Sequence, residues 1–134
     1  MPLHKLISVL GQPKNSLPLS DSEWNSIIRA ARQTDLLGQL GSAIHAAMAP
    51  DTIPPQVKRA INLELLTAQR RGEAALWEIR VMRRLIPSDI PIIALKGCAY
   101  VLAKDRNATG RLYSDIDLLV DAEDLGRVES ALIS

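Results

Sequence analysis

The stretch Gly-Arg-Leu-Tyr-Ser-Asp-Ile-Asp-Leu-Leu-Val, residues 110–120, decides how this chain is interpreted. Its two acids, Asp115 and Asp117, are separated by one isoleucine and followed by three apolar residues. Side chains alternate between the two faces of an extended strand, so both carboxylates are expected on one face with the apolar residues on the other. Tyr113–Val120 is therefore predicted to be a strand that presents paired acids.

Two neighbouring carboxylates point to a cation as their partner. Acids held side by side repel each other, and a hard cation with oxygen ligands, such as Mg²⁺, stabilises them by bridging the pair. The alternative is that Asp115 and Asp117 lie on the water-facing side of an edge strand. An isolated Asp-x-Asp pattern does not choose between these, so the surrounding sequence has to decide.

The residues before this stretch predict a second strand. Ile90–Leu95 is an apolar run with three isoleucines, as expected for a buried strand. Gly97 ends that strand, Cys98–Ala103 is predicted to form a short helix, and Lys104–Arg111 a polar loop. After the paired acids, Asp121 is positioned to cap a last helix. This part of the chain is therefore predicted to contain two main strands and two helices.

The first part of the chain is predicted to be helical. Ser20 and Glu23 have the spacing of a capping box, in which each side chain satisfies a free backbone donor near the other. Apolar residues then recur at helical spacing over residues 24–48, which predicts one long helix, or two shorter ones with breaks near Gly38 and Gly41.

A long helix is predicted from Pro55 to Ile86, because apolar residues recur there in steps of three and four. Its polar face carries more bases than acids. The bases are Lys58, Arg59, Arg70, Arg71, Arg80, Arg83 and Arg84, against the acids Glu64, Glu73 and Glu78. This face is either the solvated side of a bundle helix or a surface that attracts phosphate groups.

Composition supports an α+β fold. Phenylalanine is absent and only 3% of residues are aromatic, so Leu, Ile, Val and Ala must build most of the core. We expect a helical region over residues 1–88 and a partial core of two main strands and two helices over residues 89–134.

Charge and hydropathy restrict the partners. A net charge of +1 speaks against the whole protein being held on nucleic acid or on an anionic membrane, although a local contact stays open. No apolar run is long enough to span a bilayer, and the first residues lack the pattern of a secretory signal, so the cytoplasm is the expected compartment. The single cysteine, Cys98, rules out an internal disulfide and is predicted to be a small buried thiol rather than a nucleophile.

Leu95-Lys96-Gly97, followed by residues 110–120, resembles the polymerase-beta-like nucleotidyltransferase superfamily. More narrowly, it resembles a poorly characterised bacterial nucleotidyltransferase family whose members place an all-helical segment before this core. The resemblance covers Ile90–Leu132 well and the earlier helices loosely.

The resemblance implies roles for seven residues. Asp115 and Asp117 become ligands of Mg²⁺ or Mn²⁺ and thereby catalytic residues. Contacts to the phosphates of a nucleoside triphosphate such as ATP fall to Lys96, Gly97, Cys98, Arg111 and Ser114. Alternatively, the ammonium of Lys96 lies in water at a strand end, and Arg111 neutralises the acid pair instead of holding phosphate.

This chain departs from the superfamily pattern at two points. Its turn is Gly97-Cys98, where the superfamily usually has Gly-Gly or Gly-Ser. The third carboxylate of the superfamily sits on a later strand, whereas the acids that follow here are expected on a helix: Asp121, Glu123, Asp124 and Glu129. We therefore expect an N-terminal fragment with little transferase activity of its own.

The function that the resemblance implies is magnesium-dependent transfer of a nucleotidyl group from a nucleoside triphosphate to an unknown acceptor. The alternative is a catalytically inactive module that binds nucleotide or a partner protein. Two strands make a marginal sheet with exposed edges, so a homo-oligomer is also expected.

Overall fold

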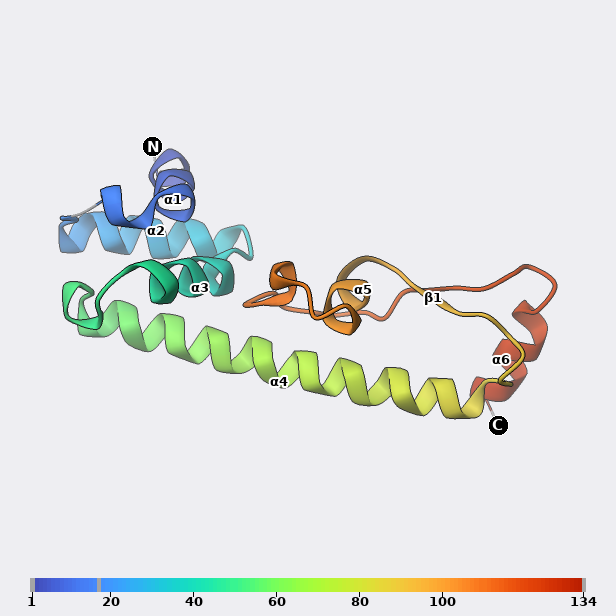
Figure 1. The fold of residues 1–134 in the computed structure, drawn as a ribbon. Coiled ribbons are helices and arrows are strands. Elements are labelled where there is room, and N and C mark those ends of the chain that lie inside the picture. Colours follow the sequence, from blue (N-terminus) through green and yellow to red (C-terminus); the bar gives the residue numbers. More distant parts are fainter. Residues whose placement is uncertain (1, 17, 134) are drawn as a thin grey trace. The chain divides into compact units, whose positions relative to one another are not determined.

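The computed structural model describes residues 2–16 and 18–133 and is mostly helical with one small sheet (Figure 1). Its α-helices are α1 (Pro2–Gly11), α2 (Asp21–Gln33), α3 (Leu37–Ala47), α4 (Pro55–Leu85), α5 (Lys96–Leu102) and α6 (Leu125–Ile133). Short 3₁₀ turns are η1 (Pro13–Ser16), η2 (Pro50–Thr52) and η3 (Arg106–Ala108), and the strands are β1 (Ile93–Ala94) and β2 (Leu118–Leu119). This arrangement confirms the predicted α+β class. No described helix is both long and apolar enough to cross a membrane.

The chain divides into two units, and α4 contributes residues to both. Unit 1 comprises Met1–Gln69 and Thr109–Leu112, and unit 2 comprises Arg70–Ala108 and Tyr113–Ser134. The predicted division into a helical region of residues 1–88 and a core of residues 89–134 stays a prediction.

Unit 1 has an aliphatic core built around one tryptophan. Trp24, Ile27, Leu40 and Ile61 are fully or almost fully buried there. The predicted capping box at the start of α2 is confirmed, because the Glu23 backbone N–H donates to the Ser20 hydroxyl while the Glu23 carboxylate accepts from the Ser20 backbone N–H. Glu23 also pairs with Lys5 of α1, which joins the first two helices at the surface.

The two shorter helices expected after Ser20 are present, but the break lies before the glycines. Residues 34–36 separate α2 from α3, where Asp35 has a left-handed backbone with φ 55°. The break expected near Gly38 is thus present, two residues before it, but Gly38 and Gly41 themselves lie buried inside α3 and no break occurs at Gly41. Their missing side chains serve packing: a Cβ on Gly41 would lie 2.5 Å from the side chain of Ile61 in α4.

Gly38 and Gly110 bring two backbones into direct contact in unit 1. A Cβ on Gly38 would lie 1.8 Å from the carbonyl oxygen of Gly110, and Gly110 itself has φ +74°. Residues other than glycine rarely adopt that backbone conformation. The glycine at the start of the 110–120 stretch is thus required by the turn and by its contact with α3.

Unit 2 has a second, smaller core at the end of α4. Ile86, Ile90 and Val128 are buried together there. The Arg83 guanidinium donates to the carbonyls of Ser88 and Ile90, and so closes the turn that follows the helix. The long helix predicted from Pro55 to Ile86 is confirmed, since α4 ends one residue earlier, at Leu85.

Helix α6 is tied to the same turn by one arginine. Arg127 donates to Asp89 at 2.9 Å and to Asp124 at 3.0 Å. The hydrogen bond from Arg127 lowers the pKa of Asp89 below its usual value. Asp121 was expected to cap this helix, but residues 122–124 form a turn and the helix begins at Leu125.

The sheet is antiparallel and shorter than predicted. Ile93 pairs with Leu119 and Ala94 with Leu118, so the strands expected over Ile90–Leu95 and Tyr113–Val120 are present only at their centres. Both strand residues Ile93 and Leu119 remain exposed, at 57% and 51%. The homo-oligomer expected from these edges stays a prediction.

We predict that Gly38→Ala destabilises the protein by about 1–3 kcal/mol, because the added Cβ overlaps backbone atoms that cannot rotate away. Gly72→Ala is the matched control: it also lies in a helix, but its Cβ would meet nothing within 4 Å. That change should stabilise the protein by up to about 1 kcal/mol. Chemical denaturation measures both, and equal stabilities of the two variants would contradict the close contact.

A pH dependence is expected from Glu23. Hydrogen bonds from Lys5 and from Ser20 lower the pKa of Glu23 from 4.5 to about 2. A carboxyl group with a lowered folded-state pKa stabilises the fold above its unfolded pKa, and this contribution is lost as pH falls from about 4.5 towards 2. The melting temperature of the wild type should therefore fall more steeply across this window than that of Glu23→Gln. Parallel curves would show that the negative charge of Glu23 contributes nothing to stability.

Candidate active site

The paired acids lie just before β2, not on it. Residues 113–117 have no regular secondary structure, and the strand begins at Leu118. Asp115 and Ile116 line the same pocket, so the strict alternation predicted for this segment does not hold. The physical reason is that pairing with β1 ends where α5 begins, which leaves residues 113–116 without a strand partner in that register.

Asp117 is held at the start of α5. Its carbonyl accepts a hydrogen bond of 2.9 Å from the Leu95 backbone N–H, which continues the sheet pairing by one step. Its carboxylate lies 3.1 Å from the Lys96 ammonium. Lys96 adopts a left-handed backbone with φ 51°, a conformation that few residues other than glycine take up. The lysine expected to contact phosphate thus lies beside one of the two acids.

Cys98 is buried, as expected for a small structural thiol. Its sulfur lies 2.8 Å from the carbonyl oxygen of Leu95 and 3.2 Å from that of Asp117. A thiol is a weak donor, and here both nearby acceptors belong to the chain segments that meet at the start of α5. The side chain of Cys98 therefore joins α5 to the segment of the acids, and its predicted phosphate contact stays a prediction.

Tyr113 positions the residues that precede Asp115. A Cβ on Gly97 would lie 2.6 Å from the Tyr113 ring, so the ring packs directly on this glycine. The Tyr113 hydroxyl donates to the Ala108 carbonyl at 3.1 Å. Gly97 is thus needed for close packing, whatever its part in phosphate binding.

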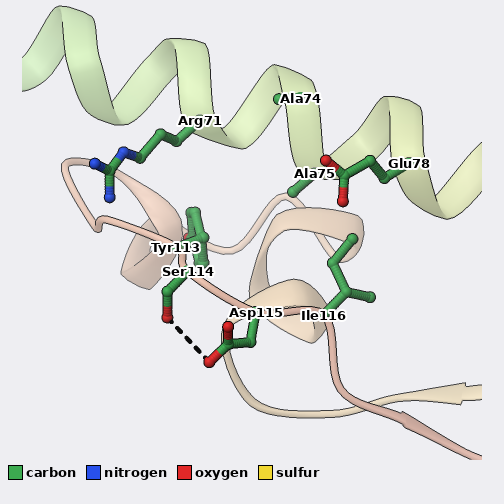
Figure 2. A pocket seen from close by; sticks show the side chains of 8 residues that line it. All are labelled: Arg71, Ala74, Ala75, Glu78, Tyr113, Ser114, Asp115 and Ile116. Carbon is green, nitrogen blue, oxygen red and sulfur yellow. Dashed lines mark hydrogen bonds between the residues drawn. The ribbon is translucent and has the colours of Figure 1, made fainter.

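A pocket of about 290 Å³ lies beside Asp115, between α4 and residues 113–116 (Figure 2). The Ser114 hydroxyl donates to the Asp115 carboxylate at 3.2 Å at its edge. Four residues of α4 also line it, and two of these, Arg71 and Glu78, are charged. Neither was singled out from the sequence, where both counted only as part of the polar face of a long helix.

Arg111 belongs to unit 1, together with its neighbours Thr109–Leu112. Its predicted contact with phosphate or with the acid pair stays a prediction. Among residues 2–16 and 18–133, no group of three or more His, Cys, Asp or Glu side chains is arranged to hold a metal ion.

The comparisons with known proteins give the family. A family model described as uncharacterised nucleotidyltransferase matches residues 20–134. The chain belongs to this nucleotidyltransferase family. No curated protein and no solved structure matches this chain.

Membership in the nucleotidyltransferase family extends well beyond the paired acids. The matched range begins at Ser20, so it includes α2, α3 and α4 as well as the small sheet. The helical part, which the sequence resemblance covered only loosely, is thus part of the family pattern. At a coarse level, the family points to transfer of a nucleotidyl group.

We predict that Lys96→Gln has opposite effects on two ligands. Removing a positive charge 3.1 Å from the Asp117 carboxylate should strengthen Mn²⁺ binding about two- to tenfold, and should weaken binding of a nucleoside triphosphate by a similar factor. Lys104→Gln is the control, because Lys104 is exposed and has a similar left-handed backbone, with φ 52°. Titration calorimetry measures both affinities. A loss of Mn²⁺ binding in Lys96→Gln would contradict the prediction that Lys96 binds phosphate and competes with the metal ion for Asp117.

Proposed function

We propose that this protein binds a nucleoside triphosphate together with Mg²⁺ at Asp115 and Asp117, and transfers its nucleotidyl group to an acceptor hydroxyl. The observation that carries the proposal is the paired acids, one held beside a lysine, in a chain of a nucleotidyltransferase family. The proposed donor is a nucleoside triphosphate such as ATP, and the proposed compartment is the cytoplasm.

The donor chemistry of the acids fits Mg²⁺. Protein sites for this ion commonly supply one or two carboxylates, and substrate phosphates and water complete its oxygen shell. Asp115 and Asp117 provide two such carboxylates within three residues. The Lys96 ammonium already beside Asp117 shows that this carboxylate accepts a cationic neighbour. When bound, the ion would supply Lewis-acid stabilisation of the charge that develops at the reacting phosphate.

The protein's own groups would orient the triphosphate. Lys96 carries a mobile positive charge with a side chain that is 73% exposed, so it can turn from Asp117 to a phosphate oxygen without a large desolvation cost. The Leu95 N–H and the Cys98 thiol hold the backbone carbonyl of Asp117. The backbone that carries the Asp117 side chain therefore stays in place while the Lys96 side chain turns. Positive charge placed beside the phosphates is a usual source of catalysis in phosphoryl transfer.

Asp117→Ala provides the first test, with Asp121→Ala as the matched control. Asp121 is an exposed acid close by in the sequence that lies outside the pocket and the Lys96 pair. Calorimetry with Mn²⁺ should show a loss of about tenfold or more in Asp117→Ala and little change in Asp121→Ala. Identical heats in all three proteins would remove the metal site.

The second arm separates an enzyme from a nucleotide-binding module. The wild type is incubated with α-labelled ATP, Mg²⁺ and a panel of protein and small hydroxyl acceptors. Metal-dependent labelling that disappears in Asp117→Ala supports transfer. Mn²⁺ and ATP binding without any labelling supports the module, which shares the binding step but not the reaction.

A further inference from the structure

The pocket beside Asp115 has opposite charges at separate points of its helical wall. Arg71 and Glu78 are seven residues apart, which places them two turns apart on one side of α4, with their Cα atoms about 10 Å apart along the axis. In Figure 2 the Arg71 side chain extends from α4 on the side of the segment that carries Tyr113, whereas the Glu78 side chain runs back along α4 towards Ala75.

These two charges are not used within the fold. Neither the Arg71 guanidinium nor the Glu78 carboxylate forms a hydrogen bond or an ion pair with any residue in the described ranges 2–16 and 18–133. By contrast, Arg83 and Arg127 in the same unit are each bound to two oxygens. Arg71 and Glu78 are therefore available to a ligand.

The wall between the two charges is made of small residues. Ala74 and Ala75 lie between Arg71 and Glu78, and they leave the volume of about 290 Å³ open. The opposite wall offers the Tyr113 ring, the Ser114 hydroxyl and the Asp115 carboxylate. The cavity is thus polar at its ends and sized for a small molecule rather than for a polymer.

The two acids of the pair are turned to different neighbours. Asp117 is beside Lys96 at the start of α5, whereas Asp115 lines the pocket with Arg71 and Glu78. Neither Asp117 nor Lys96 lines that pocket. If the triphosphate takes the Lys96 side, the pocket is the place left for the second substrate.

We propose that this pocket binds the acceptor, a small polyhydroxylated molecule that carries one anionic group, such as a phosphate ester. Arg71 binds the anion with the bidentate geometry that guanidinium offers to phosphate. Glu78 accepts hydrogen bonds from hydroxyl groups about two helical turns away, and the hydroxyl nearest Asp115 is the one that receives the nucleotidyl group. Its oxygen bonds to the α-phosphorus of the triphosphate while the bond from that phosphorus to the β-phosphate oxygen breaks, so that pyrophosphate leaves and the hydroxyl proton is released to solvent. This inference rests on the proposed function for the reaction, but its binding step does not require a metal.

The test uses three probes without metal or nucleotide: inorganic phosphate, glycerol and glycerol 3-phosphate. Backbone amide NMR shifts of residues 113–116 report binding to the wild type. Glycerol 3-phosphate should bind more tightly than either phosphate or glycerol alone, because it engages both ends of the pocket. Arg71→Gln should weaken its binding about tenfold or more, and Glu78→Gln should reduce it to the level of inorganic phosphate.

Two neighbours on α4 serve as controls. Arg70→Gln and Glu73→Gln change exposed charges of the same helix that do not line the pocket, so they should bind like the wild type. Ala74→Leu replaces an exposed residue of the wall and should abolish binding of all three probes by filling the cavity, with no loss of stability.

Equal weakening by Arg71→Gln and Arg70→Gln, or no shift at residues 113–116 with any probe, would overturn the acceptor pocket. Asp117→Ala, which tests the proposed metal site, should leave probe binding unchanged. Failure of the pocket with intact Mn²⁺ binding therefore contradicts this inference alone. Intact probe binding without Mn²⁺ binding contradicts the proposed function alone.

Discussion

The backbone of Asp117 is the point on which the geometry of the site depends. The Leu95 N–H, the Cys98 thiol and the Lys96 ammonium all meet this one residue, the first two at its carbonyl and the third at its carboxylate. The hydrogen bond from Leu95 is worth about 0.5–1.5 kcal/mol, and the exposed ion pair with Lys96 about 0–1 kcal/mol. The position of Asp117 therefore owes more to backbone pairing and the buried thiol than to the attraction between charges.

The helices could be predicted because their signals are local. The Ser20–Glu23 capping box and the apolar spacing of α4 are encoded within a few residues, and both are confirmed. The predicted strands are longer than the observed ones. Alternating apolar residues indicate that a segment can lie extended with one buried face, whereas a strand also needs a partner backbone in register. Ile93–Ala94 provides that partner only for Leu118–Leu119, so the segment of the acids remains irregular.

The site shows the same contrast between local and distant information. Asp115 and Asp117 stand out in the sequence because their pattern is short and chemically specific. Arg71, Glu78 and Tyr113 do not, since they come to the pocket from α4 and from a loop, and nothing in the local sequence distinguishes Arg71 from Arg70 beside it. The sequence does hold one signal for Tyr113, because one of the chain's only two tyrosines lies two residues before Asp115.

Small residues explain how such a site can form in an aliphatic chain. Gly97 admits the Tyr113 ring, and Ala74 and Ala75 keep the pocket open. Each of these positions would accept a larger residue by helix propensity alone, so propensity does not explain the choice. The need for space, for the Tyr113 ring at Gly97 and for a ligand at the two alanines, explains it.

Tyr113 itself is fixed by a hydrogen bond, because its hydroxyl donates to the Ala108 carbonyl. The chain continues from this anchored residue to Ser114 and Asp115. The acids are thus presented by packing on their N-terminal side and by backbone pairing on their C-terminal side.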